Sequence, residues 1–235
     1  MRKVAAPPAA EQIEKSLVTA ILGGGLGVGA SLPNERDLAA RLGVTRPTLR
    51  EVLKQLAKEG WLTIRHGKAT LVTDYWREGG LGVLKTLAQY ADALSPDLIG
   101  QLLEVRSLLL PPITVVACRR EPEALLRRLA RAEGLDDQAM AYAEFDWGLQ
   151  TLMADCAGNP VCRLIINDFA AAYAVLANLY FQGEPHRRRS RAYYRELAAA
   201  LRQGLPVEPL VRKVMLESAE AWRKLAGARG RGGGA

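Results

Sequence analysis

The sequence predicts a mainly α-helical protein: an N-terminal winged helix-turn-helix with a small β-hairpin wing, and a C-terminal all-α bundle of about six or seven helices. The 235 residues exceed one typical domain, and the hydrophobic fraction of 49% is ample for a packed core. Residues 32–70 hold two short helical patterns and a hairpin pattern around tight turns. Beyond residue 95, apolar residues recur at helical spacing without strand alternation.

The first two helices of the N-terminal domain are predicted from their stripes and ends. Leu38 and Leu42 supply the apolar stripe of the first helix, and Gly43 ends it because glycine readily adopts the left-handed conformation. Thr45 can cap the second helix, and Pro47 falls in its first turn, where a missing N–H costs little. A helix, a tight turn and a second helix are therefore expected.

The second helix is expected to bury one face and to lead into a hairpin. Its apolar stripe recurs at i, i+3, i+4 and i+7 and consists of Leu49, Val52, Leu53 and Leu56. Gly60 ends this helix, a turn is expected at 65–68, and residues 69–72 can return as the second strand of the hairpin. This hairpin would be the wing.

Charge indicates the partner of this domain. Residues 36–68 hold eight basic and three acidic residues, an excess of the kind that phosphate neutralisation needs. Arg46 and Arg50, one helical turn apart near the start of the second helix, are the candidates for bidentate contacts to guanine. A solvated basic face would explain the charges alone, but not their coincidence with the turn and the wing. Double-stranded DNA is therefore the predicted partner.

The remaining chain is predicted to form a linker, a bundle and a tail. Glycines within 79–82 and a short leucine stripe around them predict a connector that can pass a rotation between domains. The expected helices lie near 96–119, 122–133, 137–157, 160–181, 187–203 and 207–226, with a kink or break at Pro111-Pro112. The predicted divisions are 1–76 for DNA binding, 77–94 for the linker, 95–227 for effector binding and dimerisation, and 228–235 for a flexible tail.

No targeting or membrane segment is expected. The start, MRKVAAPPAA, lacks the apolar centre of a signal peptide. The most hydrophobic run, 108–118, is too short to span a membrane and contains two prolines. Cys118, Cys156 and Cys162 lack a metal-type spacing and fit reduced thiols. A cytoplasmic protein without a membrane partner is predicted.

The DNA-binding segment resembles the GntR family of transcription regulators. That resemblance is carried by NERDLAARLGVTRPTLREVLKQLAKEGWLTIRHGKAT. A more specific likeness, to the fatty-acid-responsive FadR branch of the family, is carried by GVTRPTLREVL, by GWLTIRHGKAT with Trp76, and by GLGVLKTLA. It continues through AEFDWGLQTLMADCAGNPV and LESAEAW, and so covers nearly the whole chain.

The resemblance implies which residues contact DNA. The matching positions are Arg36, Thr45, Arg46, Thr48, Arg50, His66 and Gly67. Among them, His66 and Gly67 of the wing would reach the minor groove. Pro47 departs from the pattern, because the best-studied member of the family has a threonine there. One hydroxyl contact is thereby lost, so the resemblance does not fix the exact operator sequence.

The resemblance also bears on metals. Many relatives hold a metal with an aspartate and three histidines, and this chain keeps the aspartate as Asp146. Where the histidines align it has Gln150, Arg195 and Leu216. The only histidines of the chain are His66, on the wing, and His186, so a nitrogen-rich site cannot be assembled. No metal and no cofactor are expected.

The effector implied by the resemblance is a long-chain acyl-CoA, bound in the helical bundle. It needs an apolar tunnel together with cationic or hydrogen-bonding groups for the phosphates. The matching positions are Tyr180, Arg212, Ser218 and Trp222, with Arg106 as a further candidate. Spacing puts Ser218 and Trp222 on one helical face with Met215, although spacing alone favours core packing as the explanation. Val214 and Met215 stand where the best-studied relative has tyrosine and glycine, and the methionine would narrow the tunnel.

The expected function is that of a homodimeric repressor, with activation left open as a second role. It would place two recognition helices on a palindromic operator of fatty-acid metabolism genes, and long-chain acyl-CoA would release it. A GntR-type regulator that senses another small metabolite is the alternative. An acyl-CoA-binding enzyme is a distant one, because the sequence has no phosphate loop after a strand and no G-x-S-x-G elbow, and because catalysis leaves residues 32–70 unexplained.

Overall fold

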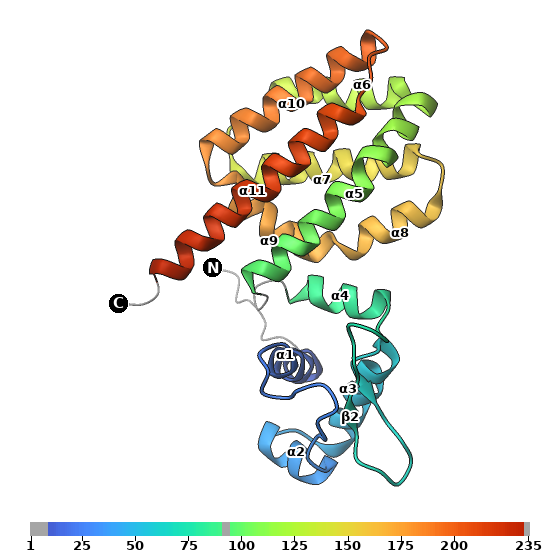
Figure 1. Ribbon diagram of the computed structural model, residues 1–235, viewed down its shortest axis with the longest axis vertical. Coiled ribbons are helices and arrows are strands. Elements are labelled where there is room, and N and C mark those ends of the chain that lie inside the picture. The colour runs from blue at the N-terminus through green and yellow to red at the C-terminus, as the bar shows by residue number, and fades with distance from the viewer. Residues whose placement is uncertain (1–8, 91–94, 233–235) are drawn as a thin grey trace. The chain divides into compact units, whose positions relative to one another are not determined.

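The structure is a computed structural model that describes residues 9–90 and 95–232, and the chain divides into two compact units between residues 93 and 94 (Figure 1). The elements of the N-terminal unit are α1 (Ala9–Leu22), α2 (Glu35–Leu42), α3 (Arg46–Glu59), β1 (Leu62–Thr63), β2 (Leu71–Val72) and α4 (Leu81–Gln89). Those of the C-terminal unit are α5 (Pro96–Arg120), α6 (Pro122–Ala130), the 3₁₀ helix η2 (Arg131–Gly134), α7 (Ala139–Cys156), α8 (Pro160–Asp168), α9 (Ala170–Phe181), α10 (Glu184–Arg202) and α11 (Glu208–Gly232). The mainly helical fold predicted from the sequence is confirmed.

The ends of α2 and α3 are as predicted. The Thr45 hydroxyl accepts a hydrogen bond from the Thr48 amide (3.3 Å), which caps the N-terminus of α3. Gly43 and Gly60 end α2 and α3 with φ of 67° and 101°. The predicted stripe of α3, Leu49, Val52, Leu53 and Leu56, is buried. The turn between the two helices is therefore set by local sequence.

Helix α1 lies outside the predicted elements. Its buried residues, Ile13, Leu17, Val18 and Ile21, form one face, and α1 packs against α3. Helix α2 has eight residues, about two turns, and is too short to cover α3 alone. Helix α1 therefore completes the core of the helix-turn-helix.

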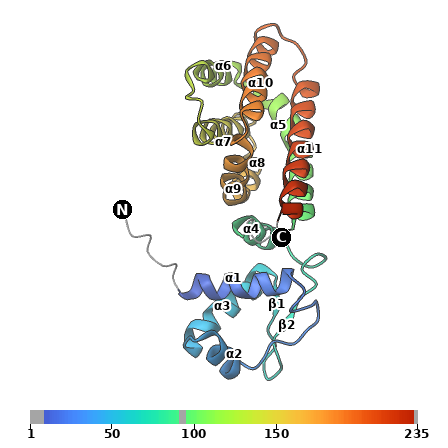
Figure 2. The same cartoon turned by 90° about the vertical axis from the view of Figure 1, so that its left-hand side faces the viewer.

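The hairpin after α3 forms the predicted wing (Figure 2). Its strands are antiparallel, with Leu62 opposite Val72, and its turn contains Gly67 at a positive φ of 70°. At its base the fully buried Trp61 packs on Tyr75, with ring centroids 4.8 Å apart. This packing anchors the wing to the core of the N-terminal unit.

Helix α4 is held to the N-terminal unit by side chains. The Thr86 hydroxyl donates to Glu59 Oε2 (2.8 Å), and the Tyr90 hydroxyl donates to Glu14 Oε1 (3.0 Å). A Cβ on Gly82 would lie 3.0 Å from the backbone of Glu59, so only glycine allows this approach of α4 to α3. The predicted linker 77–94 thus contains a helix docked on the recognition helix, and its residues 91–94 lie outside the described part of the chain.

The C-terminal unit contains seven α-helices in its described residues, within the predicted range. Helices α5 and α11 lie side by side along their length, and α5 also packs against α7 (Figures 1 and 2). Buried side chains from α5, α6, α7, α10 and α11 form the core, with Tyr142, Leu149 and Leu197 almost fully inaccessible. This core borders the pocket described below.

Three helical boundaries differ from the expectations. The single helix expected at 160–181 is two helices, α8 and α9, bent by 54° at Phe169, and the bend lets both pack on α7. Helix α5 continues through Pro111 and Pro112 without a break, because packing on α7 and α11 outweighs the lost backbone hydrogen bonds. Helix α11 extends to Gly232, beyond the expected end of the bundle at 227, and residues 233–235 of the expected tail lie outside the described chain.

By its length and apolar composition, helix α5 could also cross a membrane. Helices α8 and α9 meet the same criterion only if the bent pair is counted as one span. The hydrophobic run 108–118, expected to be too short for a span, is one part of this 25-residue helix. In the structure α5 packs against α7 and α11 and carries Arg106 in a polar network.

Candidate nucleic-acid interface and buried pocket

The outer face of α3 carries the predicted DNA contacts. Arg46 and Arg50 are exposed, while Thr48 is half-buried. The Thr48 and Thr45 hydroxyls lie 2.8 Å apart within hydrogen-bonding distance. The start of α3 therefore presents two guanidinium groups and two hydroxyls from a rigid, capped turn.

Arg50 is oriented by an acidic residue of α2. Its Nη2 and Nε donate to Glu35 Oε2 at 2.5 and 3.1 Å. Hydrogen bonding by Arg50 lowers the pKa of the Glu35 carboxyl, so this acid stays ionised. Because Glu35 takes the Nε–Nη2 edge of the guanidinium, Nη1 and one hydrogen of Nη2 are left for a base or a phosphate.

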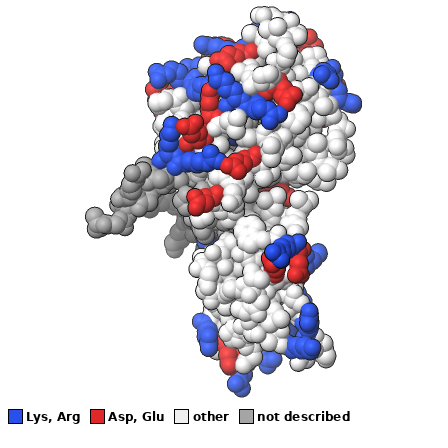
Figure 3. All heavy atoms as spheres, in the orientation of Figure 1, with Lys and Arg blue, Asp and Glu red and all other residues white. Residues whose placement is uncertain are grey.

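The other predicted DNA contacts lie nearby in the N-terminal unit. Arg36 is exposed in the first turn of α2 and makes an ion pair with Asp37 (3.3 Å). His66 and Gly67 are exposed at the tip of the wing. Figure 3 shows basic side chains gathered at the end of this unit that holds α2 and the hairpin turn. The predicted residues therefore sit on the turn, the recognition helix and the wing, as a winged helix-turn-helix requires.

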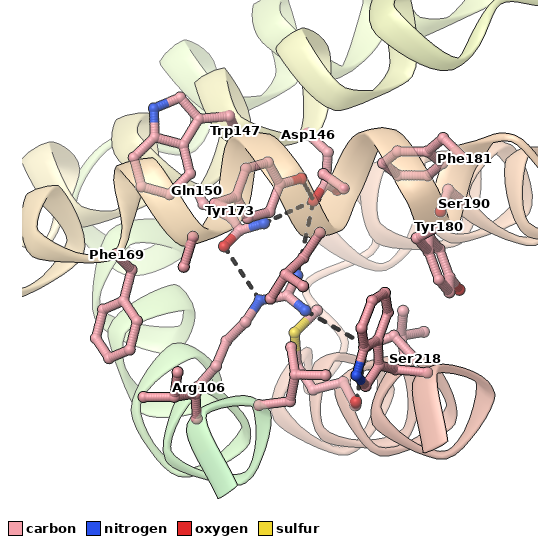
Figure 4. Close-up of a pocket in the computed structure, with 18 of the residues that line it drawn as sticks. Arg106, Asp146, Trp147, Gln150, Phe169, Tyr173, Tyr180, Phe181, Ser190 and Ser218 are labelled. Atoms are coloured by element: carbon pink, nitrogen blue, oxygen red, sulfur yellow. Dashed lines mark hydrogen bonds and ion pairs between the residues drawn. The ribbon is translucent and has the colours of Figure 1, made fainter. Parts of the chain in front are cut away.

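The C-terminal unit encloses a pocket between α5, α7, α9, α10 and α11 (Figure 4). Its volume is about 90 Å³. Most of its wall is apolar or aromatic, formed by Leu102, Leu103, Leu109, Trp147, Ile166, Phe169, Leu176, Phe181, Tyr193 and others. Its polar wall consists of Arg106, Asp146, Gln150, Tyr173, Tyr180, Ser190 and Ser218.

Arg106 organises the polar wall. Its Nε donates to Gln150 Oε1 (3.2 Å) and its Nη1 donates to Ser218 Oγ (3.4 Å), while Nη2 lies 3.6 Å from Asp146 Oδ2. Figure 4 shows the guanidinium reaching from α5 towards α7 and α11. One cation thus links three helices around the pocket.

Asp146 is the acceptor at the centre of this network. It accepts from Tyr173 (2.5 Å), Tyr194 (3.0 Å) and Gln150 (2.6 Å). Burial, and then the Asp146 charge, raise the pKa values of Tyr173 and Tyr194 well above the ordinary tyrosine value, so both hydroxyls stay protonated and donate. The carboxylate is thereby compensated by hydrogen bonds and by Arg106.

Four of the five predicted effector contacts line this pocket: Arg106, Tyr180, Ser218 and Trp222. Arg212 does not, since it is exposed on α11 and pairs with Glu208 (2.7 Å). Val214 and Met215, the two departures from the family pattern, are both in the wall. Trp222 is buried, and none of the described residues accepts a hydrogen bond from its Nε1.

The positions aligned with the family's metal ligands are used differently here. Asp146 and Gln150 bond each other, Arg195 pairs with Glu133 on the surface (2.8 Å), and Leu216 is exposed. Within residues 9–90 and 95–232, no group of three or more His, Cys, Asp or Glu side chains is placed to hold a metal.

The sequence did not single out Tyr173, Tyr194 or Glu35. The two tyrosines are far from Asp146 in the chain and carry no local motif. Glu35 stands 15 residues before Arg50 and is brought to it only by the turn between α2 and α3. A carboxylate in the first turn of α2 was the one available signal for this pair, and helix capping explains such a residue equally.

Comparison with known families agrees with this architecture. Residues 9–72 match the family described as bacterial regulatory proteins, gntR family, and residues 73–228 match the FadR C-terminal domain. The chain belongs to the GntR family. The match to the FadR C-terminal domain covers the helical unit that contains the pocket.

Curated relatives of this GntR-family protein carry the name fatty acid metabolism regulator protein. The one from Shewanella amazonensis is 39% identical over 214 residues, covering 90% of this chain and 89% of the relative. The one from Cronobacter sakazakii is 39% identical over 199 residues, covering 84% and 83%. These relatives are named as regulators rather than enzymes, so the acyl-CoA-binding enzyme falls away as an alternative.

Among solved structures, one described as Lar, which controls expression of the Listeria monocytogenes agr system, superposes with a TM-score of 0.60. It covers 95% of this chain and 98% of its own, at 16% identity. This likeness concerns the fold alone. The fold of this chain is thus recognisable where little sequence similarity is left.

Proposed function

We propose that this GntR-family protein is a cytoplasmic, homodimeric regulator of fatty-acid metabolism genes, and that long-chain acyl-CoA releases it from a palindromic operator. The names of its relatives support the metabolic assignment. The winged helix-turn-helix supports the DNA partner. Repression follows if the DNA-bound protein blocks transcription, and activation is a second role of the same contact.

The observation that carries the effector proposal is the pocket with its unsatisfied donor. An apolar chain fits the aromatic and aliphatic wall, while a thioester carbonyl needs hydrogen-bond donors. Trp222 Nε1 is buried without a partner, and Ser218 lies one turn before it on the same face of α11. A buried donor without a partner is costly, so a ligand that accepts from it gains affinity.

The pocket must open to hold such a ligand. Its volume of about 90 Å³ is below the roughly 300 Å³ at which small-molecule sites begin. A long acyl chain would therefore move apart helices that line the pocket, α5, α9 and α11 among them. The ligand would then bind the opened conformation more tightly than the closed one. Such a difference in affinity is the thermodynamic requirement for a switch.

Dimerisation follows from the way a recognition helix reads DNA. One α3 covers one half-site, and a palindrome is read by two copies related by a two-fold axis. In one conformation of the dimer, the two recognition helices would be wrongly spaced for the operator. Release needs an effector whose affinity for that conformation is roughly 100-fold higher, a difference of about 2.7 kcal/mol. Helix α4, docked on α3 through Thr86 and Gly82, is the element that would transmit the change.

Titration calorimetry with oleoyl-CoA, with free oleate and free CoA as controls, tests the effector. Micromolar or tighter binding of the thioester alone is expected. The Trp222→Ala variant should lose this binding and keep its affinity for DNA. Absence of heat with oleoyl-CoA would contradict the proposal.

One observation favours a second candidate, a regulator that senses a small carboxylate. A volume of about 90 Å³ and a guanidinium in the wall suit a small anion better than a long chain. The same calorimetric experiment with acetate, pyruvate and citrate separates the two. Heat with one of these and none with oleoyl-CoA would favour the small-molecule sensor.

A further inference from the structure

A surface groove lies beside the buried pocket of the C-terminal unit. The groove has a volume of about 480 Å³ and is formed by the start of α10 and by α11. Its lining residues are His186, Glu217, Glu220, Ala221, Lys224 and Leu225. Ser218 and Trp222, which line the pocket, directly follow Glu217 and Ala221 in the chain. The pocket and the groove therefore lie on adjacent sides of α11.

Two stacked aromatic rings stand between the groove and the pocket. Tyr180, near the end of α9, lines the pocket, and His186, in the first turn of α10, lines the groove. The two rings are stacked, with centroids 4.2 Å apart and planes at 25°. Figure 4 shows the Tyr180 ring at the edge of the pocket, with its hydroxyl directed away from Arg106. This pair of rings is called the ring stack below.

The backbone around the ring stack is fixed. Only Gln182 and Gly183 connect α9 to α10. Arg187 Nη1 donates to the carbonyl oxygens of Phe181 (2.7 Å) and Gln182 (2.9 Å). A Cβ on Gly183 would lie 2.8 Å from His186 Cδ2, so glycine lets the imidazole fold back on the turn. The turn cannot move as a whole without breaking these contacts.

The two rings are held less firmly than the backbone. Within the described chain, no side chain forms a hydrogen bond with either ring. Burial lowers the pKa of His186 below the ordinary histidine value, so its imidazole is neutral at about pH 7 and forms no ion pair. The carboxylates of the groove have other partners, since Glu217 pairs with Arg189 (2.8 Å) and Glu220 with Lys224 (3.0 Å). Rotation of the two rings therefore breaks packing contacts and no polar bond.

We propose that the ring stack is a gate, and that an apolar chain passes from the groove into the buried pocket when the Tyr180 and His186 side chains rotate apart. Opening the gate joins the pocket, of about 90 Å³, to the larger groove. An amphiphile can then keep its polar end in the groove while its chain lies in the pocket. The identity of that amphiphile rests on the proposed function, whereas the gate does not.

Alkylation of a cysteine inside the pocket measures the gate without any effector. Ser218→Cys puts a thiol in the pocket wall, and N-ethylmaleimide must pass the gate to reach it. His186→Ala, added to this variant, should raise the alkylation rate about 2–10-fold, the factor that corresponds to the loss of one aromatic stack. His186→Phe should restore the slow rate, because it keeps a ring against Tyr180.

Two controls distinguish the gate from a general loosening of the bundle. Arg188→Ala, an exposed change on the same helix as His186, should leave the alkylation rate at position 218 unchanged. Cys118 is buried in the core outside the pocket wall, so its own alkylation should stay slow in every variant. An unchanged rate at position 218 in His186→Ala would overturn the gate, as would an equal increase at Cys118.

Stopped-flow mixing with oleoyl-CoA separates the gate from the proposed effector. His186→Ala should raise the association rate by the same factor and leave the dissociation rate nearly unchanged, because a bound chain already holds the rings apart. A purely structural role of His186 would change dissociation as well, and an unchanged association rate would place the entrance elsewhere. If the wild type binds no oleoyl-CoA, the proposed effector is wrong, and the alkylation rates alone decide whether the gate exists.

Discussion

Arg50 and Glu35 join the recognition helix to the helix before it, with Arg50 Nη2 donating to Glu35 Oε2 at 2.5 Å. The pair is half-exposed, so its direct contribution to stability is small. Its effect is geometric. Glu35 restricts the rotamers of Arg50 and leaves the outer edge of the guanidinium free, which makes Glu35 a positioning residue for the DNA contact.

Arg50→Ala and Glu35→Gln should therefore affect DNA binding in different ways. Arg50→Ala is expected to remove about 1–3 kcal/mol of discrimination per half-site. Glu35→Gln should lower the ratio of specific to non-specific affinity by about 3–10-fold, since Arg50 remains but samples more rotamers. Fluorescence anisotropy on selected and scrambled duplexes measures both ratios.

Lys85→Ala, an exposed change on α4 of the same unit, is the matched control and should alter neither ratio. All three variants should keep the wild-type affinity for the effector. An Arg50→Ala protein that binds the selected duplex like the wild type would show that the recognition surface lies elsewhere.

The N-terminal unit was predictable where local rules decide. Thr45, Gly43 and Gly60 fix the helix ends through their own backbone and side-chain chemistry, and the stripe of α3 fixes its buried face. Helix α1 was not predictable in this way, because its burial depends on α3, which follows much later in the chain. The bend at Phe169 is of the same kind, since it depends on packing against α7.

The pocket was predictable only in part, and through resemblance. Ser218 and Trp222 share a helical face, which spacing alone indicates. Arg106 and Asp146 are 40 residues apart in the sequence and meet only when α5 packs on α7. Arg212, by contrast, occupies a matching sequence position but faces Glu208 on the surface. A helix position one turn away from a pocket can thus look like a contact in sequence and lie outside it.

Asp146→Asn should destabilise the C-terminal unit. The change leaves Arg106 without its anionic partner in a largely buried site and weakens the acceptor used by Tyr173 and Tyr194. A loss of about 3 kcal/mol in the free energy of unfolding is expected. Urea unfolding followed by circular dichroism measures it.

Asp155→Asn is the control for this prediction. Asp155 pairs with Arg163 at 2.5 Å, but both side chains are substantially exposed. A surface pair of this kind contributes about 0–1 kcal/mol. Equal losses in the two variants would mean that the buried network adds nothing beyond an ordinary ion pair.

Glu14→Gln should stabilise the N-terminal unit near neutral pH. Burial, the largest effect, raises the pKa of the Glu14 carboxyl above its ordinary value, and the hydrogen bond from Tyr90 offsets part of this. With a higher pKa in the folded state, folding favours the protonated acid, so the wild type loses stability as pH rises through that raised pKa. Glutamine has no charge to bury and escapes this loss.

The gain from Glu14→Gln should therefore be largest at about pH 7 and vanish at about pH 4, where both proteins carry a neutral group. Thermal unfolding at the two pH values measures the difference. A stabilisation that is equal at both pH values would assign the effect to something other than ionisation.

Met215→Ala should lengthen the acyl chain that the pocket prefers. Met215 is buried in the wall on α11, and its side chain occupies space beside Ser218 and Trp222. Each additional buried methylene contributes about 0.8 kcal/mol, so room for two more would raise the affinity for the longer chain by about 10-fold relative to the shorter one. Calorimetry with a series from octanoyl-CoA to oleoyl-CoA measures this ratio.

Met153→Ala is the control, because it removes the same volume from the core outside the pocket wall. It should lower stability without changing the preferred length of the acyl chain. If both variants shift the preferred length alike, general loosening of the bundle, and not the width at position 215, sets the selectivity.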